Sequence, residues 1–506
     1  MKKQLFFYVL CVPFLLLAQT YEVYRSDIYD PAGIDGDFFG SPFAVSDDGN
    51  RIAVASRFHD GATGTEANIG KVSMYEFNSG NWVKLGSDIV GIQAGDQLGN
   101  VLAMNATGTI VAVGSRTGAP NGSNSGYVQV FEYNGTNWIQ QGATFEGQSV
   151  GEALGTAVSM SADGTRLAIG SVGVNSGAGE VKVYSYNGSS WSQFGSTLSG
   201  VVTNDQFGTS VDMDNTGDFL AIGAPFVDTN GTPDGENRGQ VKVYEYTSNW
   251  NEVFVATGFG ANDILGSKVV LSGNGGVLAV AALQSTNFDP SNGPGYVRTY
   301  SKSGNTYTYF RDTFGENAND RFGRTLALNE NGLFMAVGAP FNDTFGSNFG
   351  KTFLYKREVQ GGVTNWYLRP GEYDDSETAG TGSEVGLNAD GNILFTYTFY
   401  ENDPNGVPGV IKTYGDLSTL SVEERIIDAN MKIYPNPTTG IVNISNVSNY
   451  PISAIKVFDL TGRLCFEKNV NSIENVSIDM NDLSTGSYLV NIQSGQVSKT
   501  IKVNKR

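Results

Sequence analysis

The chain is poor in the residues on which many catalytic centres and disulfide frameworks depend. It has a single histidine, His59, and only two cysteines, Cys11 and Cys465. One histidine excludes a multi-histidine zinc site and leaves His59 as the only histidine available to a Ser-His-Asp triad. The sequence also contains no glycine-rich phosphate loop that follows a strand and opens a helix. The usual signatures of a catalytic centre are therefore missing.

Positive charge and long apolar runs are also scarce. Lys and Arg total 32 against 51 Asp and Glu, which gives a net charge of −19. That balance argues against nucleic acid or anionic lipid as a partner, because both require clustered Lys and Arg. Beyond the first 19 residues no stretch is apolar enough for a membrane helix. We expect a protein that is not integral to the membrane.

Residues 1–19 have the organisation of a secretory signal. Lys2 and Lys3 precede an apolar run from Leu5 to Leu17, and Ala18 lies near the expected cleavage point. Cleavage removes Cys11 and leaves Cys465 as the only cysteine, so no internal disulfide can form. The sequence therefore predicts export of a protein whose stability comes from packing.

What the chain has in abundance is a repeated phrase. It reads acidic-x-Phe/Leu-Gly, a short strand, an x-Gly turn and a Leu-Ala-Val-Gly run, and it occurs seven times. Intervals of 53 to 59 residues separate the anchoring glycines, and such a period is typical of stacked or radial β-units. The anchoring glycines are Gly40, Gly99, Gly155, Gly208, Gly266, Gly323 and Gly382.

Each repeat predicts four strands. The first follows the anchoring glycine, the second is the Leu-Ala-Val-Gly run, and the third alternates as in Gly239–Tyr246. The fourth begins at an aromatic residue, for which packing between neighbouring sheets is the favoured role over ligand binding. That position holds Trp82, Trp138, Trp191, Trp250 and Trp366, with Tyr307 in repeat five.

The two ends of the array complement each other. Repeat seven stops after its third strand, Val410–Tyr414, while Thr20–Tyr24 reads as a fourth strand without a repeat. Pairing these two segments protects edges that an open array would expose. We therefore predict an all-β fold in which residues 20–415 form a seven-bladed β-propeller closed by an N-terminal strand.

The repeats resemble the FG-GAP repeats of the integrin α-subunit propeller and its bacterial relatives. The resemblance rests on the Phe-Gly pairs that end at Gly40, Gly208 and Gly323 and on the Gly-Ala-Pro triplets that end at Pro225 and Pro340. That family often holds Ca²⁺ between the first two strands. Here the connection is a short turn with too few oxygen ligands, so calcium sites are not expected there.

Two acidic patterns are candidate sites. One acidic residue lies three positions before the anchoring glycine in six repeats, and we favour a turn-fixing role for it over a cation-binding ring. A weaker candidate for a Ca²⁺ site lies in a variable loop, where Asx turns explain the same residues at least as well. The repeated residues are Asp37, Asp96, Glu152, Asp205, Asp263 and Asp320, and the loop candidates are Asp228, Asn230, Asp234 and Glu236.

The C-terminal region is a separate module. Residues 416–432 read as a linker, and residues 433–506 read as short alternating strands of a small Ig-like β-sandwich. This module resembles the type A sorting domain of the type IX secretion system of Bacteroidetes. The resemblance implies recognition by the secretion machinery and a location in the medium or on the outer cell surface. The matching segments are Tyr434–Pro437, Phe458–Arg463, Leu483–Tyr488 and the basic end Lys502–Arg506.

Three functions fit these features. The leading hypothesis is a non-enzymatic binding or adhesion protein whose propeller face binds a glycan or a protein. One alternative is an extracellular polysaccharide lyase or glycoside hydrolase that uses propeller carboxylates, although no carboxylate spacing selects a pair. The other is a structural component of the cell surface. No cofactor is firmly implied.

Overall fold

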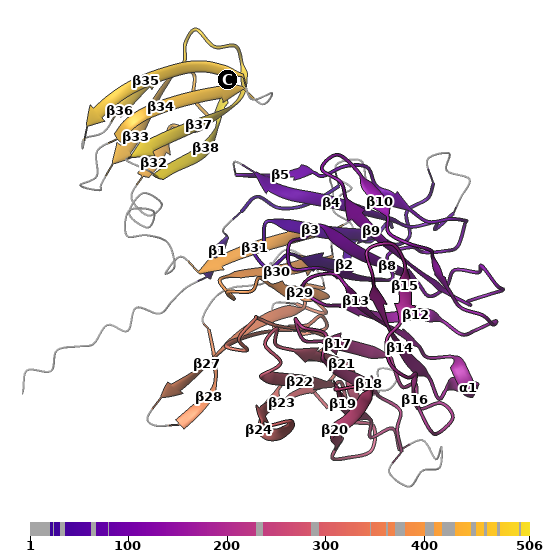
Figure 1. Cartoon of the computed structure of the whole chain (residues 1–506). Helices are drawn as coiled ribbons and strands as arrows, with labels where there is room; N and C mark the ends of the chain where they lie inside the picture. Colours follow the sequence, from indigo (N-terminus) through magenta and orange to yellow (C-terminus); the bar gives the residue numbers. More distant parts are fainter. Residues whose placement is uncertain are drawn as a thin grey trace, which may run out of the picture. The chain divides into compact units, whose positions relative to one another are not determined.

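The structure is a computed structural model in which β-strands account for nearly all regular structure of the described residues, arranged in antiparallel sheets (Figure 1). The chain divides into two compact units, Glu22–Gly415 and a C-terminal unit that begins at Asp416. The predicted signal and most of the predicted linker lie outside the described residues. Those described are 21–23, 25–30, 36–61, 67–78, 80–228, 236–284, 293–344, 346–360, 363–369, 380–399, 409–416, 431–446, 452–459, 463–472, 476–494 and 497–506.

The first strand of each sheet follows its anchoring glycine or includes it. All seven anchoring glycines have a positive φ, between 81° and 107°, which glycine adopts without steric penalty. The chain can therefore turn sharply as it enters each sheet. The first strands are β2 (Phe39–Val45), β7 (Val101–Met104), β12 (Leu154–Met160), β17 (Ser210–Met213), β21 (Leu265–Leu271), β25 (Thr325–Leu328) and β29 (Glu384–Leu387).

The second strands are the apolar runs, and they lie between two hydrogen-bonded neighbours in every sheet. Every described side chain of β18, β22 and β30 is buried, as expected for a strand covered on both faces. The second strands are β3 (Arg51–Ser56), β8 (Ile110–Ser115), β13 (Arg166–Ser171), β18 (Phe219–Ala224), β22 (Val277–Ala282), β26 (Phe334–Ala339) and β30 (Ile393–Thr398).

The third strands carry the predicted alternation of apolar and polar residues. Short additional strands pair with three of them: β6 (Ile89–Val90), β11 (Phe145–Glu146) and β16 (Leu198–Ser199). The third strands are β4 (Lys71–Asn78), β9 (Tyr127–Tyr133), β14 (Glu180–Tyr186), β19 (Gln240–Tyr246), β23 (Tyr296–Ser303), β27 (Lys351–Gln360) and β31 (Val410–Asp416).

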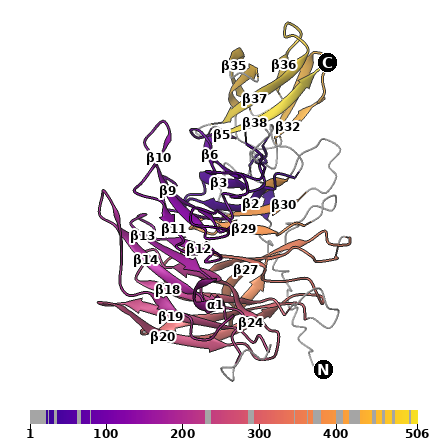
Figure 2. The ribbon, with the colours of Figure 1, turned by 90° about the vertical axis from the view of Figure 1, so that its right-hand side faces the viewer.

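The fourth strands lie at the outer edges of the sheets (Figures 1 and 2). The last sheet has the order β1-β31-β30-β29, so β1 (Tyr21–Val23) occupies the fourth position beside β31. Ile28 and Ile411 also exchange two backbone hydrogen bonds of 3.0 Å. The other fourth strands are β5 (Asn81–Lys84), β10 (Trp138–Gln140), β15 (Trp191–Gln193), β20 (Trp250–Thr257), β24 (Thr306–Phe314) and β28 (Val363–Leu368). The four-residue helix α1 (Val174–Gly177) lies between β13 and β14.

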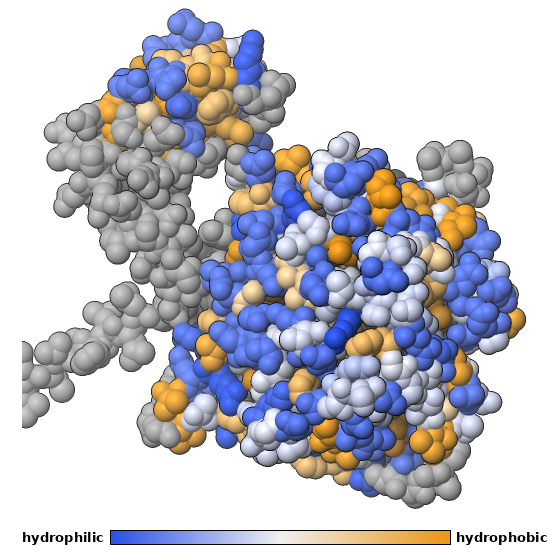
Figure 3. Space-filling view, viewed as in Figure 1, coloured by the Kyte–Doolittle hydropathy of each residue, from blue (hydrophilic) through white to orange (hydrophobic). Residues whose placement is uncertain are grey.

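Apolar clusters fill the space between neighbouring sheets, and hydrophilic residues predominate on the face of this unit that Figure 3 shows. The tryptophans take part in these clusters as predicted. The indole N–H of Trp138 donates to the carbonyl of Leu85, and that of Trp250 donates to the carbonyl of Phe194. Each of these bonds joins two adjacent sheets, so the repeated aromatic position packs and orients the sheets.

The turns between first and second strands are linked by backbone hydrogen bonds. In each case an N–H of one turn donates to a carbonyl of the corresponding turn in the neighbouring sheet, at 2.8–3.1 Å. This network has no signature in the sequence, because it involves backbone atoms only. The donor–acceptor pairs are Asp47–Ala106, Ala106–Ala162, Ala162–Asn215, Asn215–Gly273, Asn274–Glu330, Glu330–Ala389 and Ala389–Asp47.

The C-terminal unit has two sheets that share one apolar core, in which Val442 and Ile478 from one sheet contribute with Val457 and Val490 from the other. Two of its strands, β32 and β35, were not predicted, and β32 begins two residues inside the predicted linker. The sheets are β32 (Met431–Tyr434), β33 (Ile441–Asn446) and β36 (Val476–Asp479), and β35 (Leu464–Ser472), β34 (Ile452–Asp459), β37 (Gly486–Ser494) and β38 (Val497–Lys505).

Candidate functional site

The repeated carboxylates stabilise the turns between sheets. Asp96 accepts the backbone N–H groups of Ile92 and Gln93 at 2.9 Å and the hydroxyl of Tyr127 at 2.8 Å. Asp263 accepts the N–H groups of Phe259 and Gly260 and the Tyr296 hydroxyl in the same way. All six carboxylates are buried. Glu152 and Asp320 also accept backbone N–H groups of their turns, so the turn-fixing interpretation is confirmed for these four carboxylates.

His59 is paired with the first of these carboxylates. Its Nδ1 lies 3.0 Å from Oδ2 of Asp37, and its side chain is 23% exposed. No hydrogen bond between a serine or cysteine side chain and the His59 ring is present among the described residues. The contact therefore orients His59 within its turn and does not assemble a catalytic triad.

The loop candidates for a Ca²⁺ site are only partly described. Asp228 is buried and accepts the backbone N–H of Asn237 at 2.6 Å. Glu236 pairs with Arg238 at 2.9 Å. Asn230 and Asp234 lie outside the described residues. A metal site formed by these four residues remains a prediction.

Asp205 is the repeated carboxylate with the most perturbed acidity. Burial, helped by the negative charge of Asp228, raises its pKa to about 6. Asp320 of repeat six is in a similar setting, because burial, helped by the negative charges of Glu316 and Asp343, raises its pKa as well.

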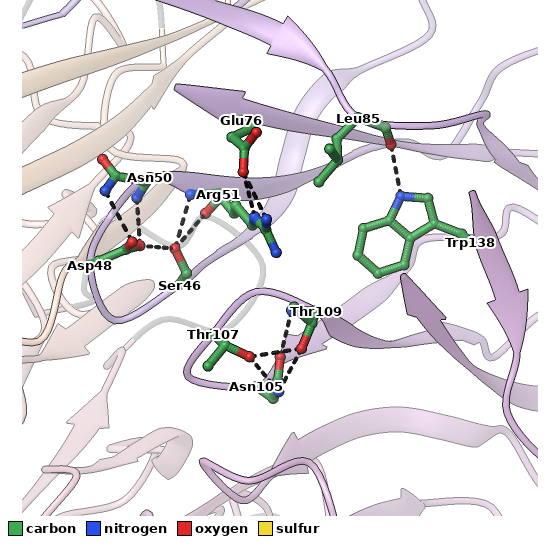
Figure 4. Close-up of polar contacts among 10 residues, drawn as sticks. All are labelled: Ser46, Asp48, Asn50, Arg51, Glu76, Leu85, Asn105, Thr107, Thr109 and Trp138. Atoms are coloured by element: carbon green, nitrogen blue, oxygen red, sulfur yellow. Dashed lines mark hydrogen bonds and ion pairs between the residues drawn. The ribbon is translucent and has the colours of Figure 1, made fainter. Parts of the chain in front are cut away.

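The turn after β2 uses its side-chain oxygen atoms in hydrogen bonds within the turn. In the turn after β2, the Ser46 hydroxyl donates to Asp48, and Asp48 accepts the backbone and side-chain N–H groups of Asn50 (Figure 4). Arg51 donates to Glu76 beside it. These residues border a surface hollow of about 650 Å³, yet their polar atoms already satisfy one another. The hollow therefore has little to offer a ligand.

A polar cavity of about 300 Å³ lies among the first strands. Asp212 projects into it and accepts the Ser159 hydroxyl and the Leu271 N–H. Burial raises the pKa of Asp212 to about 6, although these bonds and Lys268 act in the opposite direction. Burial likewise raises the pKa of Glu384 despite nearby positive charges.

The most distinctive hollow is a pocket of about 420 Å³ lined by arginine and aromatic side chains, which we call the arginine pocket. Three sheets contribute to it: the β2 sheet, the β25 sheet and the β29 sheet. In the part of the chain that the structure describes, no aspartate or glutamate lines it. The lining residues are Phe38, Ser41, Arg57, Arg321, Arg324, Pro340, Phe341, Asn348, Gly380, Ser383, Tyr397 and Phe399.

Local structure sets the positions of the arginines. Arg57 follows β3 at the position that Pro340 occupies after β26. Arg321 is in the left-handed region, with a φ of 54°, just before the anchoring Gly323, and Arg324 follows that glycine. The end of β3 thus places Arg57 at the hollow, and the sharp turn around Gly323 places Arg321 and Arg324 there.

Aromatic rings surround these charges. The Phe38 and Phe399 rings stack with a centroid distance of 5.1 Å and an interplanar angle of 17°. The Arg57 guanidinium carbon lies 5.5 Å from the Phe38 ring centre, and that of Arg321 lies 4.8 Å from the Phe341 ring centre. Such cation–π contacts hold an arginine in place without neutralising its charge.

Burial and neighbouring arginines act against the charged forms of Arg57 and Arg321. Burial is the main cause that lowers the pKa of Arg57, and Arg324 and Arg116 lower it further. Arg321 has a lowered pKa for the same two reasons, burial and Arg324. A guanidinium stays charged even so. An anion in the pocket would relieve this repulsion.

In the sequence, the arginines of this pocket are departures from the repeat consensus. Two repeats have Ser-Arg, ending at Arg57 and Arg116, where others have Ala-Pro, ending at Pro225 and Pro340. Arg321 and Arg324 also flank the Phe322-Gly323 pair. These departures from the repeat consensus are local, but only the fold shows which of them meet.

The fold and the pocket define an all-β, repeat-built protein with many four-stranded antiparallel sheets of the kind found in propeller blades. Residues 191–244 match the FG-GAP repeat model, and residues 432–506 match the model described as a secretion system C-terminal sorting domain. The chain accordingly carries an FG-GAP repeat and a C-terminal sorting domain of the type IX secretion system, which indicates a secreted or cell-surface protein. That domain implies an interaction with the secretion machinery.

Comparison with other proteins adds little about the ligand. No curated protein matches the sequence. Among solved structures, Kuenenia stuttgartiensis hydrazine synthase is similar at 12% identity, with a TM-score of 0.46, over 76% of this chain and 98% of that chain. A likeness of that degree supports no functional conclusion. A search of the described residues found no helix long and apolar enough to span a membrane.

Proposed function

We propose that residues 20–415 form a closed seven-bladed propeller. In support, the first strands of successive sheets contact one another, and β29 contacts β2. One apolar cluster contains Phe43 and Val54 from the first repeat together with Phe395 and Ile411 from the last. The backbone hydrogen bonds between turns likewise include Ala389 to Asp47.

Closure by β1 makes a measurable prediction. Deleting residues 20–24 leaves β31 as an exposed edge and is expected to lower the unfolding midpoint. The amides of Val410–Asp416 should then exchange faster with solvent hydrogen. Unchanged protection of these amides would contradict closure by this strand.

We further propose that the propeller is a non-enzymatic binding module, displayed or released by the sorting domain. The observation that carries this proposal is the arginine pocket, which combines three guanidinium groups with aromatic rings. Ligand pockets typically pair an apolar lining with a few such polar groups. The repeated carboxylates, in contrast, serve the turns.

Glycan arrays and pull-downs with the secreted full chain test the binding function. Binding of at least one glycan or surface protein is expected, and it should be lost when the pocket arginines are replaced. Uniformly negative results would contradict the proposal. A variant that lacks residues 432–506 should remain on the inner side of the outer membrane, which separates export from binding.

A polysaccharide lyase or hydrolase is the second candidate, favoured by the raised pKa of Asp205 beside Asp228. Perturbed carboxyl groups gather at catalytic sites, although structural pairs also produce them. Release of reducing ends or unsaturated products from a polysaccharide panel tests this function. Activity that Asp205→Asn abolishes would establish it against the binding proposal.

A further inference from the structure

The arginine pocket concentrates positive charge in a strongly acidic chain. The protein has a net charge of −19, yet Arg57, Arg321 and Arg324 line one hollow in which no carboxylate is found among the described lining residues. Glu384 is the acidic group that lies close enough to affect Arg57 and Arg324, and burial raises its own pKa. Focused positive potential of this kind attracts an anion.

Two polar groups in the pocket lack partners among the described residues. Tyr397 is 1% exposed, and its hydroxyl makes no hydrogen bond. The buried Nε of Arg57 also makes none, and neither Arg57 nor Arg324 forms an ion pair. A buried polar group without a hydrogen bond destabilises the fold. A ligand oxygen that accepts hydrogen bonds from these two groups would offset that free-energy cost.

The rest of the lining favours a ring-shaped ligand over a bare ion. Phe38 and Phe399 form a stacked pair, and Phe341 and Tyr397 add two more rings. The electron-rich faces of such rings attract the polarised C–H bonds on the flat side of a sugar. An inorganic anion would use the arginines and leave these rings uncovered.

We propose that the arginine pocket binds an acidic sugar residue of a polysaccharide. The arginines bind its oxyanion, either a uronate carboxylate or a sulfate ester, and the aromatic rings contact the sugar ring. A guanidinium donates two parallel hydrogen bonds to such an oxyanion, which gives strength and direction. This inference rests on the proposed binding function and names its ligand class.

Calorimetric titration of the secreted full chain with three probes tests it. The probes are oligogalacturonate, a sulfated galactan without carboxylates, and neutral galactan. One or both acidic probes should bind, more weakly as salt rises, and which of them binds identifies the oxyanion. Arg57→Gln and Arg324→Gln should each raise Kd roughly tenfold or more.

Arg116→Gln is the matched control. Arg116 occupies the repeat position of Arg57 and acts on the Arg57 charge, but it is not one of the lining residues, so its replacement should raise Kd far less than replacement of Arg57 or Arg324 does. Arg324 is exposed, so Arg324→Gln tests the charge without disturbing a buried contact. Unfolding midpoints measured alongside identify any variant that fails to fold.

The outcomes separate this inference from the proposed function. Equal affinity for neutral and acidic galactan would overturn the inference and leave a glycan-binding protein. Binding of polyglutamate as tight as that of the acidic sugars, or an unchanged Kd in Arg324→Gln, would overturn it as well. Failure of every glycan and protein probe would refute both.

Discussion

Replacing Trp250 should reveal how much of the stability resides between sheets. Its side chain is 6% exposed, its ring lies 5.3 Å from that of Tyr246, and its N–H donates to the Phe194 carbonyl at 3.0 Å. Trp250→Ala removes a large buried ring and leaves a cavity, which costs about 3–5 kcal/mol. Trp250→Phe keeps much of the packing but leaves the carbonyl of Phe194 without its partner, at a cost of about 1–3 kcal/mol.

Urea unfolding measures the change in the free energy of unfolding for both variants, as the shift in midpoint multiplied by the m-value. Unfolding is followed by the circular dichroism of the backbone, because this signal does not depend on the replaced tryptophan. Tyr309→Ala is the matched control, because Tyr309 belongs to the fourth strand of the next sheet and is 59% exposed. It should change the free energy of unfolding by less than about 0.5 kcal/mol. A Trp250→Ala variant as stable as the wild type would refute the inter-sheet packing role.

Three further predictions concern the repeated positions and the cavity. Gly208→Ala should destabilise the protein more than Gly188→Ala does. Both residues have φ above 90°, but a Cβ at Gly208 would lie 2.9 Å from the Glu180 carbonyl oxygen, while nothing lies within 4 Å of a Cβ at Gly188. Equal unfolding midpoints of the two variants would contradict this prediction. Asp96→Asn should cost about 1–3 kcal/mol of stability, because it replaces one acceptor of several N–H bonds, and leave ligand affinity unchanged. Asp212 has a raised pKa in the folded state, so its contribution to the free energy of unfolding is present below about pH 4 and is lost as the pH rises through about 6. This loss amounts to at most about 3 kcal/mol. Asp212→Asn should remove it, which unfolding curves at about pH 4 and 7 measure.

The strand order was predictable because its signals are local and repeated. Each sharp turn needs a positive φ, so glycine recurs at positions such as Gly208 and Gly323. Each gap between sheets needs a large ring, so an aromatic residue recurs at the start of the fourth strand. Seven copies of the glycine signal and six of the aromatic signal reinforce one another, and the predicted second and third strands match the observed ones closely.

The strands β32 and β35 were missed for the opposite reason. Each occurs once, in a module without internal repeats, so no second copy reinforces a weak pattern. In β35 the segment Leu464–Ser472 mixes charged and apolar residues, because one face is open to solvent. Pairing with β34 determines that segment as a strand, and pairing is a property of the folded chain.

The arginine pocket could not be predicted from spacing. Arg57 and Arg324 are separated by more than half of the chain, and they meet only because the first and last repeats lie together. Nor do the three arginines occupy one repeat position. A search for periodic residues therefore finds Asp96 and its equivalents and passes over Arg57.

Periodicity itself separates structural residues from candidates for function in this fold. A side chain needed by every sheet recurs in nearly every repeat, and the carboxylates equivalent to Asp96 indeed serve the turns. A ligand contacts a limited part of the surface, so its contacts fall on residues that depart from the repeat consensus. Arg57, Arg321 and Arg324 are such departures, and they converge where the array begins and ends. At each of these positions most other repeats have a small or apolar residue. Recognition of an external anion explains why an arginine is present here instead.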